Sequence, residues 1–590
     1  MLGNRLVIGL DYGTTYTGVS FCETSDAGAL EKHIEVIKDW PSRHTKIGTK
    51  EKVPSEIAYL SDGMKWGSLI PTNAQRHMWT KLELDSPQAG EAARIQRELV
   101  ANTRVTLKQP VDIVADFLEQ VKGHLIKNLN TQYGEELWRT LPITLVITVP
   151  AVWSDAAKAR THQAVRMAGF DNSSFPKLKR TITITEPEAA ATYTIQSLRG
   201  SAQDEQFALG DGFIVCDMGG GTVDLISYIV AELNPTILEE ATVGDGDQCG
   251  GSFVERGFLK WLERRLGTAD FVKVAGCRSD EIPRTSMSKK LGQMVQDFVL
   301  EAKSGFCGTE TSYLRLPTPL SAVDDDESRG ISDGEIVITS EDMQEMFEFP
   351  LRRTYELILG QIQQARCSGK VQLKHLIMVG GFSESPYMYE KIKAFAKLNG
   401  LQAIRPANAW SAVVRGAAAK GLEGDGRKHI KNRKCRRNYG TECCRPFDAK
   451  QHKEIDAYIC PFSGQKMARD QMAWGLKKGQ DLSTSEVSHA STTFGQHIWV
   501  GNKRHSSIEL MASDADKPAT RASDKTVYTL ATLDVDLSMV PEREFQLMYS
   551  PSGVACHKLE FDMEISVEST IEYSLTVNGI KYGSVNAKYH

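Results

Sequence analysis

The chain has 590 residues, of which 41% are hydrophobic and 25% charged, and its formal net charge is −5 at pH 7. These values are typical of a globular protein with several domains, and the small negative charge gives no reason to expect nucleic acid as a direct partner. No run of about 18 apolar residues is present, so we expect no membrane span.

The apolar run from Leu6 to Leu10 is too short for a signal peptide. Eleven cysteines are scattered without the spacing of a disulfide framework, and reduced thiols are typical of the cytosol and nucleus. We therefore expect a cytoplasmic protein, with the nucleus as the alternative.

Near the N-terminus, an apolar strand leads into an aspartate and a polar turn, in the segment Val7-Ile-Gly-Leu-Asp-Tyr-Gly-Thr-Thr-Tyr-Thr-Gly-Val-Ser-Phe21. A polar stretch with little periodicity follows to about residue 55, and Lys81 lies in the short segment Trp79 to Glu83. Helices are then predicted over 111–129, 156–168 and 188–198, and strands over 143–149 and 181–185. This alternation indicates an α/β fold, and the second strand leads directly into Glu186.

The plan of the N-terminal motif returns in Phe213-Ile-Val-Cys-Asp-Met-Gly-Gly-Gly-Thr-Val-Asp-Leu225, where Asp217 matches Asp11 and Gly219 matches Gly13. Strand, glycine turn and strand predict a β-hairpin whose backbone N–H groups suit a phosphate. A carboxylate at the end of the first strand can face a hydrated Mg²⁺. Each motif alone is also compatible with an ordinary glycine-rich hairpin, but the pair indicates a duplicated domain that clamps one ligand between its halves.

The rest of the α/β region continues to about residue 422. Gly250-Gly251 precede a predicted helix over 252–266, and Phe298 to Lys303 is expected to be helical. A strand over 374–379 ends in Gly380-Gly-Phe-Ser-Glu-Ser-Pro386, and small residues at helical spacing from 407 to 422 close the region.

The sequence changes character at about residue 425. The segment 426–520 holds the basic run Arg427 to Arg437, which we interpret as a solvated connection rather than a nuclear signal or anion patch. Zinc ligands and free thiols are the alternatives for its cysteines, and the adjacent Cys443-Cys444 pair favours free thiols. The residues concerned are Cys435, Cys443, Cys444 and Cys460, with His429 and His452. Alternating apolar residues over 559–567 and 571–577, followed by Asn578-Gly579, predict an antiparallel β domain over 521–590.

Together these motifs resemble those of the 70-kDa heat-shock (DnaK-like) chaperone family. They occur in the family's order over about residues 5–420: Asp11-Tyr-Gly-Thr-Thr15, Val149-Pro-Ala-Val-Trp-Ser-Asp155, Thr185-Glu-Pro-Glu-Ala-Ala-Ala191, Asp217-Met-Gly-Gly-Gly-Thr222, Gly250-Gly251 and Val379-Gly-Gly-Phe-Ser383. The last motif, the cysteine segment and the short β tail look closer to the divergent branch typified by heat-shock proteins 12A and 12B. The resemblance implies an actin-like ATPase fold of two ribonuclease-H-like lobes, over 1–210 and 211–425, with ATP or ADP and Mg²⁺ between them.

The resemblance also implies roles for the residues that match family motifs. Asp11 and Asp217 match carboxylates that hold Mg²⁺ through water, and Asp224 matches an acid at the far side of the second hairpin. The implied catalytic residues are Lys81, Glu186, Asp217 and Thr222, with Glu186 near the attacking water. The implied nucleotide contacts are Gly13, Thr14, Thr15, Tyr16, Gly219, Gly220, Gly221, Thr222, Gly250, Gly251, Lys303, Gly380, Gly381 and Ser383.

The sequence also departs from the family pattern. Ser304 stands where the family usually has an arginine beside the base, and Trp410 stands where it usually has an aspartate. We find no leucine-rich linker between the domains, and we expect the β tail to lack a helical lid and an acidic terminal motif. These departures concern base selectivity and the coupling of nucleotide to client.

Three functions follow from these expectations. The first is an ATP-hydrolysing chaperone whose β domain holds unfolded or partly folded protein clients, with co-chaperones as further partners. The second is a nucleotide-binding scaffold or signalling protein that hydrolyses little or no ATP. The third is a small-molecule kinase, because sugar kinases share the duplicated fold, but the β tail and motif forms argue against it.

Overall fold

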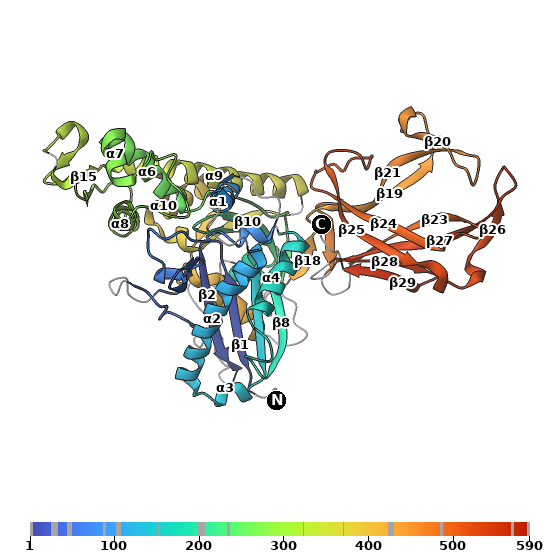
Figure 1. Ribbon diagram of the computed structural model, residues 1–590, viewed down its shortest axis with the longest axis horizontal. Helices are drawn as coiled ribbons and strands as arrows, with labels where there is room; N and C mark the ends of the chain where they lie inside the picture. The colour runs from blue at the N-terminus through green and yellow to red at the C-terminus, as the bar shows by residue number, and fades with distance from the viewer. Residues whose placement is uncertain are drawn as a thin grey trace. The chain divides into compact units, whose positions relative to one another are not determined.

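The computed structural model describes residues 4–24, 34–43, 50–85, 90–101, 108–151, 153–198, 207–232, 237–322, 324–369, 371–422, 430–483, 488–567 and 571–586. The chain divides into two compact units, Met1–His429 and Ile430–His590 (Figure 1). In the described segments, no helix has the length and apolar character needed to cross a bilayer.

The first lobe of the N-terminal unit is built on a mixed sheet with the strand order β3-β2-β1-β7-β8. Strand β1 pairs antiparallel with β2 and parallel with β7, and it is buried along its whole length. The strands are β1 (Leu6–Tyr12), β2 (Tyr16–Glu23), β3 (Glu35–Val36), β7 (Ile143–Val149) and β8 (Leu178–Thr185), with β4 (Val53–Pro54) on β2 and a separate hairpin of β5 (Ile57–Leu60) and β6 (Gly63–Trp66).

The helices of this lobe follow the predicted apolar spacing. The predicted helix over 111–129 is confirmed as α2 (Pro110–Tyr133), whose residues Val114, Leu118 and Val121 are fully buried in the lobe core. The other helices are α1 (Gly90–Ala101), α3 (Leu137–Thr140), α4 (Asp155–Met167) and α5 (Glu186–Leu198). The final helix of the unit, α11 (Ala412–Leu422), returns to pack on α5 and on strands β1 and β7.

The second lobe repeats the plan of the first. Its sheet has the order β17-β16-β9-β10-β11, in which β9 pairs antiparallel with β10 and parallel with β16. The strands are β9 (Gly212–Met218), β10 (Val223–Glu232), β11 (Ile237–Glu240), β12 (Asp245–Asp247), β16 (Leu373–Val379) and β17 (Gln402–Ile404). The predicted duplication of the α/β lobe is therefore confirmed: an antiparallel hairpin lies beside parallel strands in both halves.

Helices and a small sheet complete the second lobe. They are α6 (Ser252–Leu266), α7 (Thr268–Ala275), α8 (Lys289–Asp297), α9 (Ser340–Ser368) and α10 (Pro386–Leu398), with β13 (Ser312–Arg315), β14 (Ile331–Ser332) and β15 (Glu335–Ile338). The expected helix over 298–303 is a π-helix, Phe298–Lys303, because Ser304 N–H donates to the carbonyl of Val299, five residues back.

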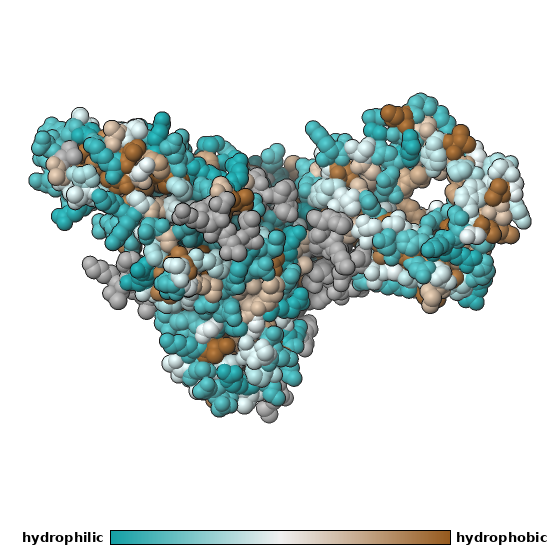
Figure 2. All heavy atoms as spheres, viewed as in Figure 1, coloured by the Kyte–Doolittle hydropathy of each residue, from teal (hydrophilic) through white to brown (hydrophobic). Residues whose placement is uncertain are grey.

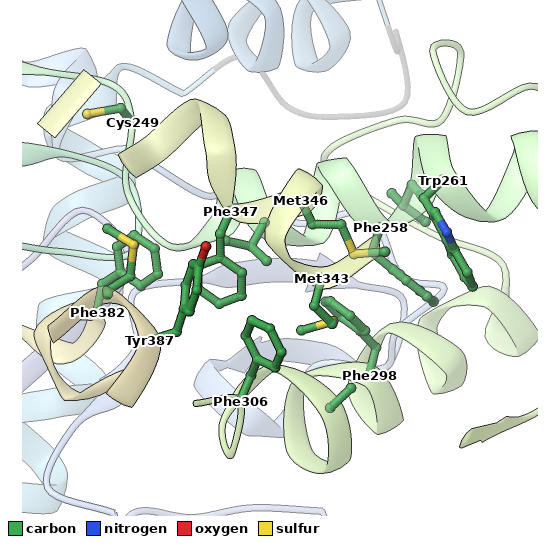
Figure 3. Packing of buried hydrophobic residues seen from close by; sticks show 14 of the residues in the cluster. Cys249, Phe258, Trp261, Phe298, Phe306, Met343, Met346, Phe347, Phe382 and Tyr387 are labelled. Carbon is green, nitrogen blue, oxygen red and sulfur yellow. The ribbon is translucent and has the colours of Figure 1, made fainter. Parts of the chain in front are cut away.

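An aromatic and methionine cluster fixes the glycine-rich loop after β16. Figure 3 shows Phe382 in this cluster beside Phe347 and Tyr387. The ring of Phe382 is stacked on that of Phe347, with centroids 6.0 Å apart and an interplanar angle of 19°. Since α9 carries Phe347, the core of the lobe holds the Gly380–Phe382 loop in place.

The C-terminal unit is an antiparallel β structure with two five-stranded sheets. One has the order β20-β21-β19-β24-β25, and the other has β23-β27-β28-β29 with β26 on β27. Their strands are β19 (Asn438–Pro446), β20 (Ala457–Ile459), β21 (Lys466–Leu476), β23 (Ser488–Trp499), β24 (His505–Ser513), β25 (Val527–Asp536), β26 (Gln546–Tyr549), β27 (Ala555–Val567), β28 (Ile571–Val577) and β29 (Ile580–Asn586), and the short strands β18 (Ile430–Lys434) and β22 (Asp481–Ser483) pair with each other.

The alternation at the C-terminus has the predicted structural result. Leu559, Met563 and Leu575 are buried in the core between the sheets. Asn578 and Gly579 both have positive φ, +51° and +77°, as the expected hairpin turn requires. Strands occupy the cysteine-containing segment from Ile430 onward, while residues 427–429 of the basic run, with His429, lie outside the described residues.

Candidate functional site

The two predicted hairpin turns meet face to face inside the N-terminal unit. A Cβ atom added to Gly220 would lie 2.5 Å from Thr15 Oγ1, and one added to Gly221 would lie 2.9 Å from Thr14 Cγ2. Only glycine therefore allows the second turn to approach the first so closely. Asp11 and Asp217, at corresponding places on β1 and β9, both face the cavity beside these turns.

The cavity at this junction has a volume of about 590 Å³ and is lined by both lobes. This size is in the range of a small-molecule or cofactor site. Most of the predicted site residues line it: Asp11, Gly13, Thr14, Thr15, Tyr16, Lys81, Glu186, Asp217, Gly219, Gly220, Gly221, Thr222, Asp224, Gly251, Lys303, Gly380 and Gly381. Gly250 and Ser383 do not line it, although both were expected to contact the nucleotide.

These two residues support the loops instead. Gly250 N–H donates to the carbonyl of Gly221 at 3.1 Å. Ser383 is fully buried, and its hydroxyl donates to the carbonyl of Gly380 at 2.7 Å. Both residues therefore hold the backbone that faces the cavity.

Asp11 forms a buried ion pair that sequence analysis missed. Lys52 Nζ lies 2.6 Å from Asp11 Oδ2, and Thr148 donates to Asp11 Oδ1 at 2.8 Å. Burial alone would raise the pKa of Asp11, but Lys52 and Lys81 outweigh burial and lower it. Lys52 lies just before β4, in the polar stretch that has little periodicity. The only sequence feature that marks it is its place directly before Val53 and Pro54.

Lys81 forms a second buried ion pair, with Glu186. Trp79, two residues before Lys81, is 1% exposed and has φ of +58°, a left-handed conformation that is uncommon for a bulky residue. The Trp79 ring packs against Gly221, and the Arg256 guanidinium lies over it at 5.5 Å from the ring centroid. The surrounding packing therefore fixes this turn and directs Lys81 into the cavity.

Glu186 begins α5 directly after β8. Burial raises its pKa to about 7, although the Lys81 ammonium acts in the opposite direction. Such a carboxylate can accept a proton near neutral pH, which suits a group that orients or activates water.

Two further carboxylates lie in the site without a lysine partner. Burial, together with neighbouring carboxylates, raises the pKa of Asp217 and of Asp224 to about 7. Among the described residues, the Asp217 carboxylate makes no hydrogen bond. At the phosphate end of the cavity, the carboxylates of Asp11, Glu186, Asp217 and Asp224 thus face Lys52 and Lys81, so this end has an excess of negative charge when the acids are ionised.

This donor set fits a hydrated Mg²⁺ beside a phosphate. Carboxylate oxygens and water are the ligands Mg²⁺ prefers, and it retains several waters when bound. Asp217 supplies an unpaired carboxylate for it, and Asp11 supplies one that Lys52 and Thr148 already contact. Among the described residues, no three His, Cys, Asp or Glu side chains form a cluster that could ligate a metal directly, either in this cavity or in the cysteine segment.

The far end of the cavity is aromatic. Trp410 lines it next to Gly381, and its ring meets that of Tyr16 edge-on with centroids 5.8 Å apart. The π-helix brings Lys303 to this end, where its ammonium donates to Gly251 O at 2.8 Å and to Glu255 Oε1 at 2.7 Å. Ser304 also faces the cavity, but its hydroxyl donates to the carbonyl of Val299.

Residues 7–432 match the family model described as Hsp70 protein. The chain belongs to the Hsp70 family. Its lobes therefore form the actin-like ATPase fold of Hsp70 proteins, as expected from the sequence motifs, and antiparallel β sheets follow it.

Two human Hsp70 proteins are similar to this chain. The chain is 23% identical to heat shock 70 kDa protein 12B of Homo sapiens over 492 residues, which cover 70% of this chain and 68% of that protein. It is also 23% identical to heat shock 70 kDa protein 12A of Homo sapiens over 495 residues, or 71% of this chain and 69% of the relative. The expected resemblance to this divergent Hsp70 branch is confirmed as a distant one.

Proposed function

We propose that this Hsp70-family protein binds MgATP between its lobes, hydrolyses it, and uses the nucleotide state to control how its β unit holds protein clients. The observation that carries the proposal is the junction of the two aspartate-bearing turns at one cavity. Glycine-containing turns from both lobes line this cavity, and backbone N–H groups of such turns can bind phosphates.

Each charged side chain has a role in the proposed reaction. Transfer of a phosphoryl group to water depends mainly on positioning and on charge stabilisation. Lys81 adds positive charge at the phosphates, Glu186 orients the water and accepts its proton, and Thr222 contributes a hydroxyl at the second turn. Mg²⁺, when bound through water by Asp11 and Asp217, would neutralise charge on the phosphate oxygens.

The opposite end of the cavity suits a base. Trp410 and Tyr16 present aromatic surface there, and stacking on an aromatic ring tolerates any base because every base has a π face. With Ser304 and Trp410 in place of the usual arginine and aspartate, we propose that the site holds the base by stacking and selects weakly between purines.

A scaffold that binds nucleotide with little turnover is the second candidate. The observation that favours it is that Lys81 and Glu186 pair with each other, which engages both proposed catalytic groups. Turnover then requires that the γ-phosphate compete for Lys81.

Calorimetry with ATP, followed by single-turnover hydrolysis, tests these proposals. The chaperone function predicts heat on binding, hydrolysis, and faster hydrolysis with an unfolded peptide. Glu186→Gln serves as the matched variant, because it keeps the size of the side chain and is expected to bind ATP without hydrolysing it. Binding without hydrolysis by the wild type supports the scaffold, a phosphorylated product in a sugar panel supports the kinase, and absence of heat with ATP contradicts all three.

A further inference from the structure

Lys52 reaches the phosphate end of the cavity by an unusual route. Its backbone precedes β4, which pairs with β2 through Thr17 and Val53. Its side chain then crosses Gly18, because a Cβ atom added there would lie 3.2 Å from Lys52 Cγ and 3.4 Å from Lys52 Cε. Gly18 is the cross-strand partner of Asp11, so this path ends at the Asp11 carboxylate.

The Lys52 ammonium is buried but not fully occupied. The residue is 8% exposed, lines the cavity, and makes one hydrogen bond among the described residues, to Asp11 at 2.6 Å. An ammonium group has three N–H donors, so further donors are available to an anion in the cavity.

We propose that Lys52 is a phosphate-binding residue that supplies part of the positive charge otherwise supplied by Mg²⁺. Both oxygens of Asp11 already accept hydrogen bonds, from Lys52 and Thr148, so a hydrated ion shares this carboxylate with a fixed ammonium. The dependence of nucleotide binding on divalent cations is therefore weaker than it would be without this ammonium. This inference rests on the proposed nucleotide site.

The test is calorimetry of ATP binding to the full chain, with Mg²⁺ present and with EDTA. For the wild type, EDTA is expected to lower the affinity without abolishing binding. For Lys52→Met, which keeps an unbranched stem over Gly18, EDTA is expected to lower the affinity by about ten- to hundredfold more, since a charge-assisted hydrogen bond to phosphate is lost. In Mg²⁺ the variant should recover most of this loss.

Lys38→Met is the matched control. It removes one lysine charge from the same lobe at an exposed side chain that pairs with Glu51 rather than with Asp11, and it should respond to EDTA as the wild type does. The wild-type comparison needs no variant, so the inference stays testable even if Lys52→Met fails to fold.

The outcomes separate the inference from the proposed function. If the wild type binds ATP in Mg²⁺ but not in EDTA, or if Lys52→Met shows the wild-type response to EDTA, Lys52 is not a phosphate ligand and the nucleotide site stands. If the wild type binds ATP in neither condition, the proposed function fails and the inference fails with it.

Discussion

Lys81 and Glu186 place a positive charge and a carboxylate side by side where the two lobes meet. If Lys81 stabilises charge on the phosphates in the transition state, Lys81→Ala should bind ATP but hydrolyse it at least about tenfold more slowly, because loss of one such electrostatic donor usually costs about 10²–10³ in rate. Single-turnover hydrolysis measures this effect. Lys65→Ala, at a partly exposed lysine beside Asp62, is the control, and an unchanged rate in Lys81→Ala would remove Lys81 from the mechanism.

The Asp217 carboxylate, which we propose for the Mg²⁺ site, is expected to destabilise the folded protein when it is ionised. Burial raises the pKa of Asp217 to about 7, above the usual value of about 4 for aspartate. Between these two values the folded state binds more protons than the unfolded state, so stability falls as pH rises through this window, and the full cost is present above about pH 7. Asp224 and Glu186 act in the same direction, because their pKa values are also raised to about 7.

Asp217→Asn removes one of these buried charges. Without ligands it should therefore unfold at a higher temperature than the wild type at about pH 8, by about 2–4 °C for each kcal/mol recovered. At about pH 5 the advantage should be much smaller, because most of the window between the two pKa values lies above that pH. Thermal unfolding at both pH values measures this, and MgATP should stabilise the wild type more than the variant. A lower unfolding temperature for the variant at pH 8 would show that the ionised Asp217 carboxylate does not destabilise the folded protein.

At the scale of elements, the features that could be predicted from sequence are those that depend on neighbouring residues along the chain. The two hairpins, helix α2 and the Asn578-Gly579 turn each follow from spacing and from residues that permit special backbone angles. Lys52 could not be found in this way, because its role depends on the pairing of β4 with β2 and on the absence of a side chain at Gly18. The left-handed turn at Trp79 and the π-helix before Ser304 are likewise products of tertiary packing.

If the β unit holds clients, as we propose, the hairpin of β26 and β27 is our candidate for the contact. Leu547 and Tyr549 on β26 are 53% and 68% exposed, and Val554 in the connecting turn is 51% exposed. Figure 2 shows apolar groups near β26 and near β20 among hydrophilic neighbours. Exposed apolar side chains that gather in this way are typical of interaction sites.

We therefore expect the double change Leu547→Asp and Tyr549→Asp to weaken the hold on an unfolded protein. Suppression of aggregation of a denatured client measures this, and the loss should be at least about tenfold in the concentration needed, since each large apolar side chain contributes about 1.5–3 kcal/mol when buried. ATP binding should be unchanged. Ile580→Asp, at an exposed residue of β29, is the matched control, and an equal loss in that variant would argue against a localised site.

At the scale of the whole molecule, the question is whether nucleotide and client are coupled. The chain matches the Hsp70 family over residues 7–432, and the β unit has its own core. We found no leucine-rich linker between the domains in the sequence. Coupling between nucleotide binding and client binding is therefore the property that distinguishes the proposed chaperone from the proposed scaffold. Coupling is a free energy shared by two sites, so it must appear equally in the affinity of each ligand.

If the protein is a chaperone, peptide affinity should differ between ATP and ADP by about 5–150-fold, the usual range of coupling energies. The ratio of ATP to ADP affinity should change by the same factor when peptide is present, because the linkage is reciprocal. Glu186→Gln makes the ATP state measurable, since it is expected to retain unhydrolysed ATP, and fluorescence anisotropy of a labelled peptide with calorimetry of the nucleotides gives both factors. Factors that are both equal to one, in a protein that binds each ligand, would leave two independent sites on one chain, which is the property of a scaffold.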